Sequence, residues 1–326
     1  MNMFLQYIGK RDRIFTFFGL IVILLVGVRD FDSTALVSRV LWVDDDDPTC
    51  GGQSPCYRTI QEAIAAAQSG DTIKIRPGIY VEQLEIDKTL AIVGESKDLV
   101  SIKGTTLEGS GSWGLLRITK AVTVQIENIT EFEGAIGVYM ADPHARLAIS
   151  NVRFSKLIIA IMAAADAPSD NGQLTVLNSE ISTARSLGIG LFLALNSPLP
   201  HRIEGNQFVE NSTAISIDGK SFAVINNNKF INNNEGVAIK GSAVAIVQAN
   251  VIESNGNGMK AYEEAHAQIS ENQIMRNFLN GVIVHGNAQA TLINNQIAAN
   301  GLRSKSLDEP YHPFFGFFGA ELKPEG

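Results

Sequence analysis

The stretch from Ala245 to Asn255 decides the fold, and it reads Ala-Ile-Val-Gln-Ala-Asn-Val-Ile-Glu-Ser-Asn. Its first Asn belongs to a column with spacings of 22, 22, 22 and 23 residues, made of Asn206, Asn228, Asn250, Asn272 and Asn295. A second column follows five residues later, made of Asn211, Asn233, Asn255, Asn277 and Asn300. A fixed period of this length is typical of a stacked repeat architecture.

Apolar residues occupy fixed positions around these columns. Two residues after the first Asn come Phe208, Phe230, Ile252, Ile274 and Ile297, and three residues before it come Ile203, Ile225, Val247, Ile269 and Leu292. Within each repeat the apolar positions alternate with period two, which predicts short strands. Three short strands cannot enclose a core alone, so neighbouring repeats must stack. The sequence therefore predicts an all-β fold, a parallel β-helix of about ten coils over residues 71–300.

The unusual composition has a place in such a fold. Aromatic residues make up only 7% of the chain, and 18 of its 24 Asn lie between Asn206 and Asn300. We expect stacked aliphatic columns to fill the lumen. Asn suits the corners for two reasons: it tolerates the left-handed conformation, and stacked amides hydrogen-bond along a column.

Charge and hydropathy exclude two classes of protein. The chain has 326 residues, of which 18% are charged and 45% hydrophobic, so it is not a disordered protein. Its net charge is -8, from 26 Lys and Arg against 34 Asp and Glu, and no block of cations interrupts it. Binding to nucleic acid phosphates needs clustered cations, so we expect no nucleic-acid partner.

Residues 1–35 have the order of a secretory signal. Three cations, Lys10, Arg11 and Arg13, precede an apolar run over residues 14–28, and the small residues Ser33, Thr34 and Ala35 follow. The run is shorter than the roughly 20 residues of a membrane span. An uncleaved N-terminal membrane anchor is the alternative, favoured by the charged pair directly after the run. Either way the folded part is expected to be exported, to the periplasm, the extracellular space or the cell surface.

Residues 36–70 form the next expected segment, a loop followed by a helix. Cys50 and Cys56 are the two cysteines of the chain, and in an oxidising compartment they favour a small disulfide loop. A metal site is the weaker alternative, because two thiolates do not fill a tetrahedral shell. From Thr59 to Ala67 the pattern predicts an amphipathic helix with a capping box. Such a helix can plug the open end of a solenoid.

Upstream coils carry the pattern less regularly. We expect strands at Thr72–Ile75, Leu84–Ile86, Leu90–Val93 and Val100–Ile102. Wider spacings predict two insertions, at Ala163–Gln173 and Leu187–Pro200, which should emerge as loops at the corners. Beyond the last repeat, residues 301–326 are expected to be a C-terminal cap or tail, in which Pro310–Phe318 holds five aromatic residues. This segment either covers the last coil or is an exposed tail that meets a partner.

Four upstream segments carry a family resemblance: Tyr57–Ile64, Gly70–Ile73, Arg76–Glu82 and Thr89–Gly94. Together they resemble the opening of the pectin-lyase-like right-handed parallel β-helix superfamily, and are most similar to the periplasmic copper-maturation β-helix family of nitrous oxide reductase and to pectin methylesterases. The resemblance covers about residues 42–300 and implies a single-stranded, right-handed β-helix with an N-terminal capping helix. Enzymes and non-enzymes share this opening, so it implies a fold and no particular activity.

One short motif bears on chemistry. Tyr139-Met-Ala-Asp142-Pro-His144 is similar to the Tyr-x-x-Asp-Pro-His segment of mannuronan C5-epimerases. The resemblance implies that Tyr139, Asp142 and His144 surround a sugar ring, with Tyr and His in general acid and base roles. Alternation places Tyr139 outward. Ala145 departs from the family, which continues with Asp, and Lys120 is a candidate for neutralising the sugar carboxylate. A chance match in a turn is the alternative.

Other chemistry has less support. Hydrolysis by an acid and base pair of carboxylates is disfavoured, because the Asp residues between residues 101 and 307 are Asp142, Asp166, Asp170 and Asp218, and none of them are adjacent. The acidic run at residues 44–47 fits a solvated loop or an adventitious calcium-like cation site. Copper needs grouped ligands, whereas the histidines are scattered, at His144, His201, His266, His285 and His312. No cofactor is predicted, with calcium and copper left as unsupported possibilities.

Outward positions of the third strand form a polar row, Asp218, Lys240, Tyr262 and His285, which could touch a glycan. Scattered solvent-facing polar residues are the simpler interpretation.

The main hypothesis is an exported β-helix protein without catalysis that binds a polysaccharide or an envelope component, with membrane contact only through residues 14–28. One alternative is a uronate-polymer epimerase or lyase, and another is a periplasmic copper-binding protein.

Overall fold

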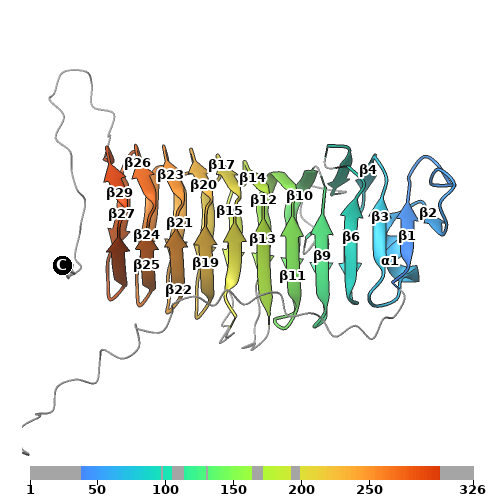
Figure 1. The fold of residues 1–326 in the computed structure, drawn as a ribbon, viewed down its shortest axis with the longest axis horizontal. Helices are drawn as coiled ribbons and strands as arrows, with labels where there is room; N and C mark the ends of the chain where they lie inside the picture. The colour runs from blue at the N-terminus through green and yellow to red at the C-terminus, as the bar shows by residue number, and fades with distance from the viewer. Residues whose placement is uncertain are drawn as a thin grey trace, which may run out of the picture. The chain divides into compact units, whose positions relative to one another are not determined.

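The computed structural model describes residues 38–96, 98–104, 114–129, 131–163, 172–191 and 199–301. One face of the strand stack is a 12-stranded parallel sheet, here called sheet A, in which β2 flanks β1 and one further strand is added per coil (Figure 1). Its strands are β1 (Val40–Val43), β2 (Cys56–Tyr57), β3 (Thr72–Ile75), β6 (Leu90–Gly94), β9 (Thr123–Glu127), β11 (Arg146–Ser150), β13 (Gln173–Leu177), β16 (His201–Glu204), β19 (Phe222–Asn226), β22 (Val244–Gln248), β25 (His266–Ser270) and β28 (Gln289–Ile293).

The remaining strands form two parallel ladders joined through the long strands β10 and β12, together called sheet B. They are β4 (Gly78–Val81), β5 (Leu84–Ile86), β7 (Val100–Lys103), β8 (Leu116–Ile118), β10 (Glu131–Met140), β12 (Arg153–Ala163), β14 (Glu180–Ser182), β15 (Leu187–Leu191), β17 (Gln207–Val209), β18 (Thr213–Ile217), β20 (Lys229–Ile231), β21 (Glu235–Ile239), β23 (Val251–Glu253), β24 (Asn257–Ala261), β26 (Gln273–Met275), β27 (Asn280–Val284) and β29 (Gln296–Ala298). The chain makes about nine turns. The predicted all-β parallel β-helix is confirmed.

The lumen is filled by residue columns that run from coil to coil. One column reads Phe132, Phe154, Ile181, Phe208, Phe230, Ile252 and Ile274, each fully buried and in register with the next. Its phenylalanines stack pairwise, with ring centroids 5.0 Å apart for Phe132 and Phe154 and 4.9 Å for Phe208 and Phe230. Because parallel strands lie about 4.8 Å apart, like side chains meet at van der Waals distance in every coil.

Both Asn columns form hydrogen-bonded ladders inside the corners. The backbone N–H and the Nδ2 of Asn228 both donate to Oδ1 of Asn250, at 2.8 and 3.0 Å, and Asn233 donates in the same way to Asn255 at 2.9 and 2.9 Å. Nδ2 of Asn250 also donates to the carbonyls of Ile225 and Gln248. Each buried amide therefore satisfies backbone groups of neighbouring coils as well as its own polar atoms.

The expected left-handed conformation of these asparagines is wrong. Positive φ falls one residue earlier, as at Asn227 (54°) before Asn228, Ala249 (53°) before Asn250, and Arg276 (55°) before Asn277. The ladder asparagines themselves are not among the residues with positive φ, and their amides bond to the coils on either side. The corner bends at the preceding residue, and it does so with Ala or Arg as well as with Asn.

The four strands expected upstream are present as β3, β5, β6 and β7. Two expectations need correction. Leu187 to Leu191 forms β15, because Leu187, Ile189 and Leu191 pair in register with β18, so the second insertion begins only after this strand. Likewise β1 lies in the segment expected to be loop and helix, and its residues pair with β3, so sheet A begins before residue 71.

Helix α1 spans Ile60–Ala66 and begins as predicted, with the reciprocal capping box of Thr59 and Glu62. The N–H groups of Ile60 and Gln61 donate to the carboxylate of Glu82 in the strand stack. The helix buries Ile60, Ala63 and Ile64. Its role as the plug of the lumen stays a prediction.

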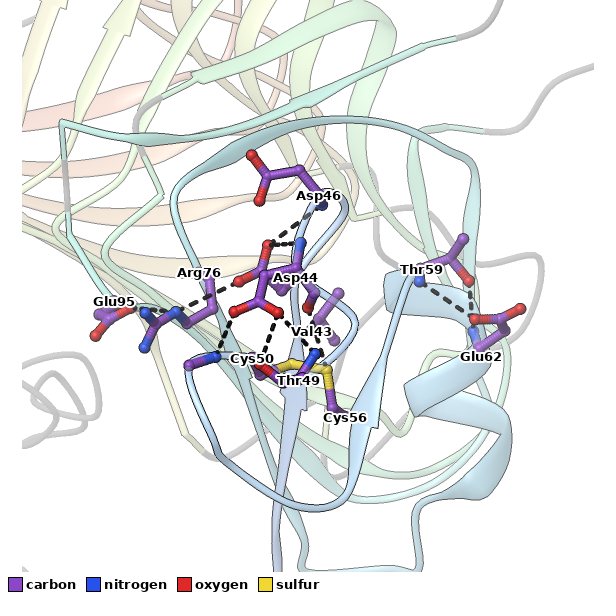
Figure 2. The surroundings of a disulfide bond; sticks show 12 residues. Val43, Asp44, Asp46, Thr49, Cys50, Cys56, Thr59, Glu62, Arg76 and Glu95 are labelled. Carbon is purple, nitrogen blue, oxygen red and sulfur yellow. Dashed lines mark hydrogen bonds and ion pairs between the residues drawn. A yellow bond between two sulfur atoms is a disulfide. The ribbon is translucent and has the colours of Figure 1, made fainter.

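Cys50 and Cys56 form a disulfide, seen with the capping box in Figure 2.

Several predicted segments lie outside the described residues: the signal over 1–35, residues 164–171 and 192–198 of the two insertions, and Pro310–Phe318. Among the helices that are described, none is long and apolar enough to cross a membrane.

Candidate functional site

The outer face of β8 and β10 brings Arg117 beside Tyr139. These residues are paired in the parallel register, between the neighbouring pairs Leu116–Val138 and Ile118–Met140. Leu116, Ile118, Val138 and Met140 are fully buried in the lumen, so alternation turns Arg117 and Tyr139 outward, both partly exposed. This confirms the predicted orientation of Tyr139. Gly114, with a φ of 102°, lies against it, and a Cβ there would come 3.1 Å from the Cβ of Tyr139.

The Arg117 side chain has no counter-ion among the described residues. Its Nε is buried without a hydrogen-bond partner. Glu85 is the in-register neighbour of Arg117 on β5, yet no ion pair joins the two side chains. A buried guanidinium N–H without a partner is costly. This N–H therefore has an unmet hydrogen-bonding capacity, and because the atom is covered, an incoming acceptor reaches it only when the covering groups move.

Asp142 and His144 lie at the corner that follows β10. The backbone N–H of His144 donates to Oδ1 of Asp142 at 2.8 Å, and Nδ1 of His144 lies 3.6 Å from the same oxygen. The two side chains are 24% and 47% exposed, so both reach solvent. Ala145 is fully buried where the epimerase resemblance would have a further Asp. The corner thus offers one carboxylate and one imidazole close together, and the carboxylate is held by the backbone of the loop.

Lys120, the candidate for neutralising a sugar carboxylate, is engaged elsewhere. Its Nζ lies 2.9 Å from Oδ2 of Asp87 on the preceding coil, and this ion pair lowers the pKa of Asp87 through the hydrogen bond from Lys120. Arg117 was not identified from the sequence, although two signals pointed to it. It stands between two lumen residues, and it precedes Tyr139 by 22 residues, one repeat length.

The acidic loop at Asp44–Asp46 is the cluster of three potential metal ligands found within the described residues. Arg76 lies beside it, with Nε 3.5 Å from Asp44 and 3.4 Å from Glu95, as Figure 2 shows. Hydrogen bonding to Asp44 and repulsion from its charge raise the pKa of Asp46. The cation of Arg76 already supplies positive charge here, so a solvated acidic loop accounts for the geometry.

The histidines do not converge. His201 is buried at the start of β16, where Nδ1 accepts the N–H of Leu174 at 3.0 Å and Nε2 has no partner. His266 lies on β25 of sheet A, whereas His285 follows β27 of sheet B. His312 lies outside the described residues. Within the described parts of the chain, no group of three potential ligands includes a histidine.

Comparison with known proteins places the chain in a fold class. Residues 167–309 match the family described as a right handed beta helix region. No curated protein sequence matches the chain. The family match and the strand register make this a right-handed parallel β-helix protein, as the pectin-lyase-like resemblance implied.

Solved structures of this class are similar to the chain at low identity. The A-module of mannuronan C-5 epimerase AlgE6 from Azotobacter vinelandii has a TM-score of 0.45 and 15% identity, over 74% of this chain and 71% of that chain. An alginate lyase from Paenibacillus has a TM-score of 0.42 and 14% identity, over 80% and 97%. Pectin methylesterase PemA from Erwinia chrysanthemi has a TM-score of 0.37 and 13% identity, over 85% and 92%.

Proposed function

We propose that this chain is an exported β-helix protein that binds a uronate-containing polysaccharide on the outer face of β8 and β10. The observation that carries the proposal is the unpartnered Nε of Arg117 beside Tyr139, with Asp142 and His144 at the following corner. It does not rest on the similarities to solved structures.

The chemistry of these side chains suits a sugar acid. A guanidinium recognises a carboxylate through two parallel hydrogen bonds, and it gains most where it is already partly desolvated. The phenol ring of Tyr139 offers an apolar body with a polar tip. Asp142 and His144 add acceptors and donors for hydroxyl groups. A neutral glycan would leave the buried Nε of Arg117 without an ionic partner.

Titration calorimetry with fragments of polymannuronate and pectate tests this proposal. Arg117→Ala is expected to weaken binding at least tenfold, because a hydrogen bond to a charged group contributes about 1.5–3 kcal/mol. Arg202→Ala is the matched control, since it removes the same charge from sheet A, where Arg202 is exposed and paired with Glu204. Equal affinities for the two variants, or no binding by the unmodified protein, would contradict the proposal.

Turnover of the bound polymer is the second candidate function. It is favoured by the corner after β10, where Asp142, three residues beyond the outward Tyr139, accepts a hydrogen bond from the backbone N–H of His144. In an epimerase, one side chain removes the proton from the carbon next to the carboxylate and the other returns a proton to the opposite face. In a lyase the same abstraction is followed by loss of the neighbouring sugar oxygen, which takes up a proton.

Proton NMR of polymannuronate and pectate incubated with the protein separates binding from turnover. New signals that disappear with Tyr139→Phe or His144→Gln would assign an epimerase or lyase. Unchanged polymers, with binding intact, would leave the non-catalytic function.

N-terminal sequencing of the mature protein tests export. The mature chain should begin near residue 36, and an intact N-terminus would favour the membrane anchor instead.

A further inference from the structure

The corner that carries Asp142 continues along the same edge of sheet B. The last lumen residues of successive strands are in register there, namely Met140, Ala163, Leu191, Ile217, Ile239, Ala261 and Val284. The residue after each of the last four is polar or aromatic and forms what we call the corner row: Asp218, Lys240, Tyr262 and His285. The corner row thus lies at the register position that follows Met140 in the candidate site.

The side chains of the corner row interact pairwise. Nζ of Lys240 lies 2.9 Å from Oδ2 of Asp218, and the hydrogen bond that Lys240 donates to Asp218 raises the pKa of Lys240. The rings of Tyr262 and His285 are parallel within 3°, with centroids 5.3 Å apart. This spacing is close to the strand separation of about 4.8 Å, so the rings stack from coil to coil. Tyr262 is partly buried and His285 is exposed.

The His285 ring has one stacking partner among the described residues, Tyr262, and His285 is exposed, so part of its side chain reaches solvent. An aromatic face can pack the apolar C–H side of a pyranose ring. The neighbouring Lys240–Asp218 pair supplies a charged donor and a charged acceptor for hydroxyl groups. A few polar groups beside an aromatic surface are what a small carbohydrate subsite requires.

We propose that the corner row is a distal subsite for the same polysaccharide, binding a sugar ring remote from Tyr139. This proposal rests on the proposed function. Six strand steps separate β10 from β27, which is about 29 Å at the strand spacing. The residues that alternation places on the outer side between them include Gly190, Ser216 and Ala238, which pair in register, are small and are buried. A polymer that occupies both sites must therefore be long enough to span that distance.

Chain-length dependence of binding tests the distal subsite. Calorimetry would use oligomannuronates and oligogalacturonates of two sizes, one too short to span about 29 Å and one longer. His285→Ala and Tyr262→Ala are expected to weaken binding of the long fragments about two- to tenfold, as the loss of an aromatic contact does. Binding of the short fragments should not change. Tyr262→Phe keeps the ring and should keep the affinity for long fragments.

The matched control is His266→Ala, because His266 is also an exposed histidine but lies on sheet A. It should leave both affinities unchanged. The distal subsite is wrong if His285→Ala leaves long fragments unaffected, or if short and long fragments lose affinity equally. Arg117→Ala distinguishes this failure from failure of the proposed function, since it should weaken fragments of both sizes. If the unmodified protein binds neither polymer, both proposals are overturned.

Discussion

At the residue scale, the corners separate two roles that the asparagine columns suggested as one. The bend is made by a residue with positive φ, and that residue is Ala at 249, Ser at 254 and Glu at 271. A left-handed conformation costs such residues roughly 1–2 kcal/mol. The cost is tolerated because the next residue is a buried Asn that joins the ladder. The sequence pattern predicted where each corner lies. The structure shows that the bend and the hydrogen-bonded ladder belong to two successive residues.

His201 provides a prediction about pH. Burial lowers its pKa to about 4, so the folded chain holds it neutral while the unfolded chain takes up a proton near pH 6.5. A depressed histidine pKa gives stability that is present above about pH 6.5 and is lost as the pH falls toward 4. The shift corresponds to about 3 kcal/mol. His201→Asn keeps an acceptor for the N–H of Leu174 and should lose this part of the acid destabilisation.

Urea unfolding of both proteins between pH 7 and 4 measures the effect. The exposed His266 gives the control, since His266→Asn should follow the unmodified chain at every pH. Parallel pH profiles for the unmodified chain and His201→Asn would show that the pKa of His201 is the same in the folded and unfolded chain, and that the prediction is wrong.

At the scale of elements, each short strand depends on the ladders at its ends. Strands of three residues, such as β20 and β23, are too short to be stable alone. Asn250 lies directly before β23 and connects its corner to two other coils, through its backbone N–H, its Oδ1 and its Nδ2. The ladder therefore fixes the register of strands that the hydrophobic pattern alone would specify weakly.

Asn250→Ala should lower the free energy of unfolding by about 3 kcal/mol. The substitution removes the acceptor for the N–H and Nδ2 of Asn228 and leaves buried groups unsatisfied, at roughly 1–3 kcal/mol each. Asn234→Ala is the control, because Asn234 is exposed in the same type of corner and surface changes stay within about 0.5 kcal/mol. Equal midpoints for the two variants in chemical denaturation would refute the ladder's contribution.

At the scale of the whole molecule, the two ends of the described strand stack differ. Near the beginning, α1 buries Ile60, Ala63 and Ile64. In the last coil, Leu292 and Ile297 continue columns in which Ile269 and Ile274 are buried, yet both are only partly buried. Solenoids need their terminal repeats covered. The last coil thus leaves apolar surface available for a cap.

Deletion of residues 310–326 tests whether the aromatic segment supplies this cover. If it does, the melting temperature should fall by a few degrees, because a chain of this size loses about 2–4 °C per kcal/mol. Tyr311→Ala within the full-length chain should give a smaller decrease. An unchanged melting temperature would leave the exposed, partner-binding tail.

The sequence alone determined the class of fold, because a 22-residue period with apolar alternation has few other solutions. It also located the lumen columns, the helix from Thr59 and the outward direction of Tyr139. Only the tertiary structure decided which residues lie together across coils. Arg117 lies beside Tyr139 in the register, Lys120 forms an ion pair with Asp87, and Tyr262 stacks on His285. These pairs depend on the register and on the direction of each side chain. A repeat fixes the spacing of coils, whereas the chemistry of its surface depends on which side chains the stacking brings within reach.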